Sequence, residues 1–128
     1  MKRTLPALAL LGSSVALAAL ATTPVFTKAQ ADAGAKVYKA QCAACHGTKL
    51  NNGGAPKLAG PDFIKKWSAP TLDDFYFIMH TTMPQTKPGS LTEKEALNVL
   101  AYILQQNSFK PGTKALTLKA LKGYHFKK

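Results

Sequence analysis

Hydrophobic residues recur at helical spacing in the two longest patterned stretches of this chain. From residue 93 to about 106 they fall every three or four positions, and Thr92 with Glu95 forms a capping box ahead of them. These apolar positions are Ala96, Leu97, Val99, Leu100, Ile103 and Leu104. A shorter stripe over residues 32–41 consists of Ala33, Val37 and Ala40. The pattern predicts a first helix over 32–41, starting at Asp32, and a closing helix over 93–106.

Two shorter helices are predicted between these stretches. Residues 61–67 begin with a proline, which suits the first helical position, and carry Phe63, Ile64 and Trp67 at core spacing. A T-x-x-D start at Thr71 precedes a helix from residue 72 to about 80. At 128 residues the chain allows one small domain, which we expect to be all-α.

The two long helices are expected to cross. Gly34 weakens the first helix unless another backbone approaches closely at that point. We therefore expect Gly34 and Tyr38 to lie near Ala101 and Tyr102 of the closing helix.

The chain begins like an export signal. Lys2 and Arg3 precede a nearly uncharged apolar run over residues 5–21, and small-residue cleavage motifs end at Ala21 and at Ala31. We favour residues 1–31 as the signal, because the predicted helix starts at Asp32; cleavage after 21 is the alternative. An uncleaved segment would instead anchor the chain, although the run is short for a membrane span. Export places the protein in the periplasm.

Lysines dominate the charge of the remaining chain. The whole sequence has a formal charge of +11, and from residue 32 onward all basic side chains are lysines. Nucleic acid is not expected as a partner outside the cytoplasm, whereas dispersed lysines suit steering toward an acidic protein face or simple solubility. Six lysines and no acids lie between residues 110 and 128. We expect one helical turn over 117–121 in this basic C-terminal extension (108–128), and a loose end past Gly123.

Cys42-Ala43-Ala44-Cys45-His46 carries the chemistry of the chain. C-x-x-C-H is the attachment motif of a c-type haem: the two thiols form thioethers to the porphyrin, and the histidine ligates the iron. A thioredoxin-like pair would need a βαβ setting, and a zinc site would need two further ligands. No strand pattern flanks the motif, and the chain has no other cysteine. We therefore predict one covalent haem, bound through Cys42 and Cys45, with His46 as a metal ligand.

Three residues are candidates for packing around this haem. Residues 47–60 form a predicted loop with a dense turn signal over 51–54. Within it, Pro56 is a candidate to accept the second N–H of His46 through its carbonyl, and Leu58 to pack on the porphyrin. Trp67 is expected in the core, with its indole N–H within reach of a propionate.

Met83 is the candidate sixth ligand of the iron. Pro84 keeps Met83 extended, which lets its thioether point at the far face of the ring. Met79 is the competing sulfur, but it fits the apolar pattern of a helix. His80 and His125 could in principle form a bis-histidine iron; we expect His80 to be a solvated helix-end residue and His125 to lie in the tail.

With these residues in place, the chain from Asp32 to about Asn107 resembles a class I, mono-haem bacterial cytochrome c. The resemblance rests on the cysteine–histidine motif, the Pro56 and Leu58 loop, Met83-Pro84 and the closing helix. It implies a cytochrome c fold (32–107), with short helices wrapped around one haem and crossing terminal helices. It also implies that Cys42 and Cys45 hold the haem and that His46 and Met83 ligate its iron.

A saturated iron leaves no position for a substrate, so we expect an electron carrier rather than an enzyme. Its partners would be redox proteins with an acidic docking face, such as a dehydrogenase, a bc-type complex or an oxidase in a respiratory chain. The lysine-rich tail leaves open a role as a subunit of a larger dehydrogenase or oxidase. Dissociation of Met83 would instead allow a peroxidase or a gas sensor.

Overall fold

Five α-helices and one 3-10 helix make up the described part of the protein. The structure is a computed structural model, and it describes residues 12–13 and 23–128. In chain order the elements are α1 (Lys28–Gln41), α2 (Ala43–His46), α3 (Pro61–Trp67), α4 (Leu72–Thr82), α5 (Glu93–Gln106) and η1 (Leu118–Gly123). The β-type pairings among these residues are two isolated bridges, so the all-α prediction is confirmed. The segment predicted as the core of the export signal (1–11, 14–22) lies outside the described residues.

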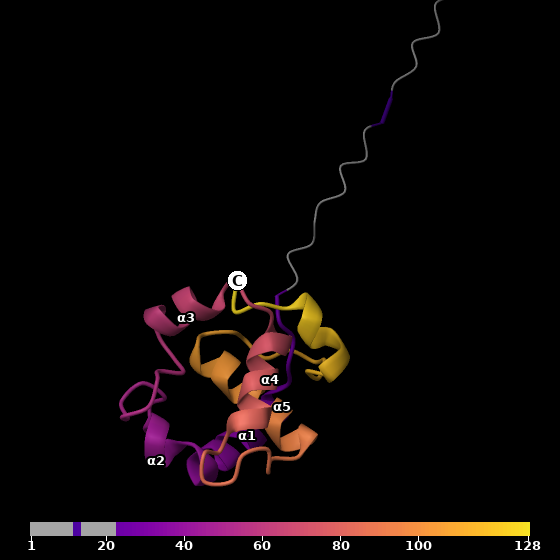
Figure 1. Cartoon of the computed structure of the whole chain (residues 1–128). Coiled ribbons are helices and arrows are strands. Elements are labelled where there is room, and N and C mark those ends of the chain that lie inside the picture. The colour runs from indigo at the N-terminus through magenta and orange to yellow at the C-terminus, as the bar shows by residue number, and fades with distance from the viewer. Residues whose placement is uncertain (1–11, 14–22) are drawn as a thin grey trace, which may run out of the picture.

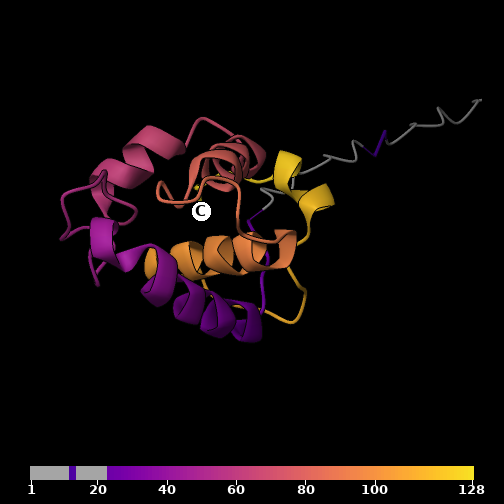
Figure 2. The same cartoon turned by 60° about the horizontal axis from the view of Figure 1, so that its bottom comes forward.

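The terminal helices α1 and α5 cross where the sequence predicts a close approach. Figures 1 and 2 show the two helices side by side, and α5 lies between α1 and α4. A Cβ at Gly34 would overlap the backbone of Asn98, so glycine is what allows this contact. Gly34 thus meets α5 one turn earlier than expected, at Asn98 rather than Ala101. Tyr38 contacts Tyr102 as predicted, with ring centroids 5.4 Å apart.

Capping boxes begin three of the helices. Thr71 with Asp74 begins α4, and Thr92 with Glu95 begins α5, as predicted. A third box, Thr27 with Gln30, begins α1. The prediction that the first helix starts at Asp32 is therefore wrong. The helix starts at Lys28, and its capping box lies upstream of the favoured cleavage site after Ala31.

The segment before α1 belongs to the folded domain. Phe26 is fully buried, and its carbonyl accepts a hydrogen bond from Gly112 N–H at 2.8 Å. The Gln30 side chain pairs with the backbone of Leu116 in both directions, at 3.0 and 2.7 Å. Phe26 and Gln30 thus bond to the C-terminal part of the chain.

The C-terminal segment also packs into the core. Leu116, Leu121 and Phe126 are almost wholly buried, and η1 replaces the single helical turn predicted there. The loose end expected past Gly123 is wrong, because Tyr124 and His125 bond to the chain around the start of α4 and Phe126 has no exposed surface. Among the described residues, none of the helices combines the length and the apolar character that a membrane crossing requires.

Candidate functional site

The cysteine–histidine motif forms one short helical turn, α2, directly after α1. Gly47 ends this turn with φ +85°, where a side chain would be strained and would also overlap the Asn51–Asn52 loop at Asn52. The hydroxyl of Tyr38 donates to the Gly47 carbonyl at 2.6 Å, which ties α2 to the crossing of α1 and α5. Burial raises the pKa of Tyr38 to about 12, so the phenol remains a hydrogen-bond donor at ordinary pH.

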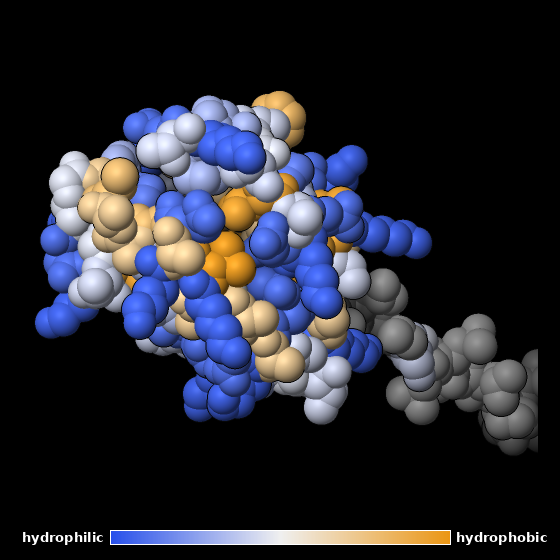
Figure 3. All heavy atoms as spheres, turned by 90° about the horizontal axis from the view of Figure 1, so that it is seen from below, coloured by the Kyte–Doolittle hydropathy of each residue, from blue (hydrophilic) through white to orange (hydrophobic). Residues whose placement is uncertain are grey.

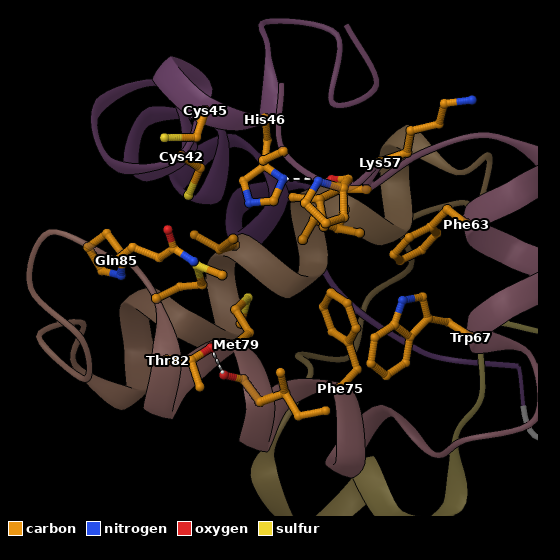
Figure 4. Close-up of a pocket in the computed structure, with 18 of the residues that line it drawn as sticks. Cys42, Cys45, His46, Lys57, Phe63, Trp67, Phe75, Met79, Thr82 and Gln85 are labelled. Carbon is orange, nitrogen blue, oxygen red and sulfur yellow. Dashed lines mark hydrogen bonds between the residues drawn. The ribbon is translucent and has the colours of Figure 1, made fainter. Parts of the chain in front are cut away.

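His46 is buried and oriented by the loop that follows it. Its Nδ1 lies 2.8 Å from the Pro56 carbonyl, which is the contact predicted for this proline. With Nδ1–H donating to that carbonyl, Nε2 carries the lone pair. Among the described residues, no group forms a hydrogen bond with Nε2, and the ring faces a cavity (Figure 4). His46 is thus held in the tautomer that a metal-ligating imidazole needs.

A cavity of about 410 Å³ joins the predicted site residues. Cys42, Cys45 and His46 lie on one side of it, and Met79, Thr82 and Gln85 lie on another (Figure 4). Met83, Pro56, Leu58 and Trp67 also line it. The structure therefore brings every predicted haem-site residue to one cavity, within the size range of cofactor pockets, about 300–1,000 Å³.

The donor set around this cavity fits a c-type haem. Two thiols, an oriented imidazole and a thioether surround a largely apolar space, which suits a porphyrin with axial nitrogen and sulfur ligands. Cys42 is partly buried, which raises the pKa of its thiol to about 11, whereas Cys45 is exposed. No group of three or more histidine, cysteine or acidic side chains suited to a metal ion occurs in the described chain.

Met83 and Met79 both reach the cavity but differ in setting. Met83 is half-buried at the C-terminal cap of α4, with the extended backbone predicted from Pro84 (φ −115°, ψ 156°). Met79 is 8% exposed within α4 and belongs to the core, as its pattern predicts. Both line the cavity that the His46 ring faces.

The two other histidines are engaged elsewhere. His80 stacks on Tyr76, with ring centroids 5.2 Å apart, and its Nε2 lies 2.9 Å from the Leu91 carbonyl. It is therefore half-buried rather than the solvated residue that was expected. His125 Nδ1 lies 2.9 Å from the Pro70 carbonyl. Neither lines the cavity, so the arrangement offers nothing for a bis-histidine iron.

Several site residues were not anticipated from sequence. Asn107 is buried and joins the end of α5 to the loop beside the cavity: its Oδ1 accepts from Gly60 N–H, and its Nδ2 donates to the Leu58 carbonyl, each at 3.0 Å. Phe63 and Phe75 form part of the cavity wall. Neither role has a local sequence signal: Asn107 is a common type of residue at a helix end, and Phe63 and Phe75 belong to no motif.

One face of the molecule has apolar residues surrounded by hydrophilic ones. Figure 3 shows the molecule from below relative to Figure 1. Hydrophobic residues are visible in the middle of this surface, and hydrophilic residues lie around them. At the rim of the cavity, Lys57 pairs with Asp62 at 2.9 Å, and Lys66 lies over the Trp67 ring at 5.5 Å. The charged side chains at the apolar cavity are thus one ion pair and Lys66.

Comparisons with known proteins find relatives among the cytochromes. The family described as cytochrome C oxidase, cbb3-type, subunit III matches residues 29–103. Cytochrome c6 of Synechococcus sp. is 35% identical over 111 residues, which cover 84% of this chain and 96% of that protein. No solved structure gives a significant match.

Proposed function

Because this chain belongs to the class I mono-haem cytochromes c, we propose that it carries single electrons between redox proteins in the periplasm. Its cofactor is a covalently bound haem c. When bound, this haem supplies a one-electron couple at its iron. The observation that carries the proposal is the single cavity that Cys42, Cys45, His46 and Met83 share.

Each of these four residues has a distinct role in the proposal. The Cys42 and Cys45 sulfurs would hold the haem covalently, and His46 and Met83 would ligate its iron. The Pro56 carbonyl orients His46, while Leu58 and Trp67 pack beside the ring. An iron ligated by both His46 and Met83 would leave no position for a substrate, which favours a carrier over a peroxidase or gas sensor.

The test of this proposal is spectral and electrochemical. The protein exported together with haem-attachment machinery should carry one haem that survives denaturation. It should also show the far-red sulfur-to-iron charge-transfer band when oxidised, and undergo reversible one-electron reduction. A high-spin ferric spectrum that reacts with peroxide would contradict the carrier function.

The same proposal includes removal of the N-terminal segment after Ala21. A cut after Ala31 would remove buried Phe26, the Thr27 cap and the Gln30 side chain that pairs with Leu116. A cut after Ala21 follows an A-x-A motif and leaves all of them in place. The mass of the mature protein from periplasm distinguishes the two sites, and an N-terminus at Asp32 would contradict the earlier cut.

Lysines are proposed to steer partners that have an acidic docking face. Among the described ion pairs, only Lys28 and Lys57 have carboxylate partners, so most lysines present unpaired charge to solvent. Oxidation of the reduced protein by an anionic metal complex should slow as ionic strength rises, and oxidation by a cationic complex should accelerate. Rates that do not change with salt for either complex would contradict steering.

A second candidate function is that of an electron-transfer subunit in a larger oxidase or dehydrogenase. The matched family is described as an oxidase subunit, and the exposed lysines of the C-terminal segment offer a charged attachment surface. Deleting residues 108–128 would remove buried Leu116, Leu121 and Phe126, so it would not isolate this surface. Replacing Lys110, Lys114, Lys119 and Lys122 with glutamine preserves the core. Loss of co-purification with a membrane complex would then favour the subunit.

A further inference from the structure

One wall of the haem cavity is built from three aromatic rings. Phe63 and Trp67 come from α3 and Phe75 from α4, and all three line the cavity (Figure 4). Phe75 is central: its ring centroid lies 5.6 Å from Phe63 and 4.8 Å from Trp67, in edge-to-face contacts near 90° and 88°. This geometry is the preferred one for aromatic pairs and holds each ring in a defined orientation.

A fourth ring supports this wall from outside the cavity. Phe126 is fully buried but does not line the cavity. Its centroid lies 4.8 Å from Phe63 and 5.2 Å from Phe75, again edge to face. Phe126 therefore touches two rings of the wall without touching the space in which the haem is placed.

The backbone around Phe126 is fixed at the start of α4. The Tyr124 carbonyl accepts from Leu72 N–H at 2.8 Å, and His125 Nδ1 lies 2.9 Å from the Pro70 carbonyl. Thr71 and His125 form an antiparallel bridge. The residue before Phe126 is thus fixed to Thr71, and Phe75 follows Thr71 by about one helical turn in α4.

From this arrangement we propose that Phe126 is a positioning residue that sets the reduction potential of the haem through Phe63 and Phe75. A dry, apolar wall disfavours the more positively charged ferric state and so raises the potential. Without Phe126, Phe63 and Phe75 lose a shared contact and can rotate, which admits water beside the haem. The inference rests on the proposed placement of the haem in this cavity.

The experiment compares full-length holoproteins. Phe126→Ala removes the supporting ring. Phe126→Leu removes the ring but keeps much of the volume of the side chain, and it is the variant to measure if Phe126→Ala does not fold. The matched control is Leu116→Ala, which truncates another buried residue of the same segment, one whose backbone pairs with Gln30. Reduction potential is measured by spectroelectrochemistry, and unfolding by denaturant is measured in parallel.

We expect Phe126→Ala to lower the potential, Phe126→Leu to lower it less, and Leu116→Ala to leave it at the wild-type value although it also destabilises the fold. An unchanged potential in both Phe126 variants would overturn the proposal. An equal fall in Leu116→Ala would also overturn it, since the effect would then be general loosening. The haem placement is tested separately, by the covalent haem and the His/Met spectrum of the wild-type protein.

Discussion

His46 is fixed by one hydrogen bond, from its Nδ1–H to the carbonyl of Pro56 (2.8 Å). Because a proline carries no N–H and has a restricted φ, this residue offers its carbonyl from a stiff backbone. The loop is held in turn by Ala55 N–H, which donates to the Cys45 carbonyl at 3.0 Å. The orientation of the imidazole therefore depends on backbone groups rather than on another side chain.

At the residue scale, the first prediction separates the two methionines. Met83→Ala should abolish the far-red charge-transfer band, lower the reduction potential and allow carbon monoxide to bind, because the proposed thioether ligand is lost. The matched control, Met79→Leu, keeps the volume of a core side chain and should retain the band. If Met79→Leu loses the band and Met83→Ala keeps it, Met79 is the ligand instead.

A second residue-scale prediction concerns Tyr38. Tyr38→Phe removes the hydrogen bond to the Gly47 carbonyl and should lower the free energy of unfolding by about 1 kcal/mol, measured with denaturant. Tyr124→Phe is the control, because the Tyr124 hydroxyl forms no hydrogen bond with any other described residue. An equal loss in both variants would contradict a specific role for the Tyr38 hydroxyl.

The raised pKa of Tyr38 adds a pH dependence to this prediction. Burial raises the pKa from 10.0 to about 12, so the folded state favours the neutral phenol. This stabilisation is fully present below pH 10 and is lost as the pH rises through about 12. The stability of the wild-type protein should therefore fall more steeply over this range than that of Tyr38→Phe. Parallel pH curves would contradict this assignment.

At the scale of elements, the close contact between α1 and α5 depends on glycine at position 34, which has no side chain. Gly34→Ala places a Cβ inside the backbone of Asn98, so one helix must shift. We expect a loss of roughly 1–3 kcal/mol in the free energy of unfolding, as for other overpacked cores. Gly54→Ala, where a Cβ would meet nothing within 4 Å, should be close to neutral. Equal stability of the two variants would contradict the close approach.

How well each element could be predicted depends on how local its signal is. The starts of α3, α4 and α5 were predictable because Pro61 and two capping boxes lie within four residues of the helices that they begin. The start of α1 has an equally local signal, Thr27 with Gln30. It was missed because the motif ending at Ala31 assigned these residues to a leader.

The parts that sequence did not predict depend on distant contacts. Phe126 follows no helical period, so nothing nearby indicates that it is buried among α3 and α4. Asn107 resembles an ordinary helix-ending residue until its amide meets Gly60, 47 residues away. The residues that line the cavity could, by contrast, largely be predicted, since the cysteine–histidine motif and the constraint of Pro84 on Met83 are short local signals.

At the scale of the whole molecule, the haem is expected to complete the core. Replacing both Cys42 and Cys45 with alanine prevents covalent attachment and leaves a cavity of about 410 Å³ beside Phe63, Phe75 and Met79. A domain of this size has little stability to spare. We expect this haem-free variant to lose its cooperative thermal transition, measured by near-ultraviolet circular dichroism. The control Cys42→Ser keeps one attachment site, and a sharp transition in the haem-free chain would contradict the prediction.

The pairing of Gln30 with Leu116, 86 residues apart, has a consequence for the order in which the molecule assembles. A chain that emerges from the ribosome or crosses a membrane N-terminus first exposes Phe26 and the start of α1 long before residues 112–116 follow. Contacts of such sequence separation form late. Until then α1 lacks both α5 and this pairing, and Cys42 and Cys45 remain open to the attachment machinery. We therefore expect the haem to be attached at Cys42 and Cys45 before the two chain ends close.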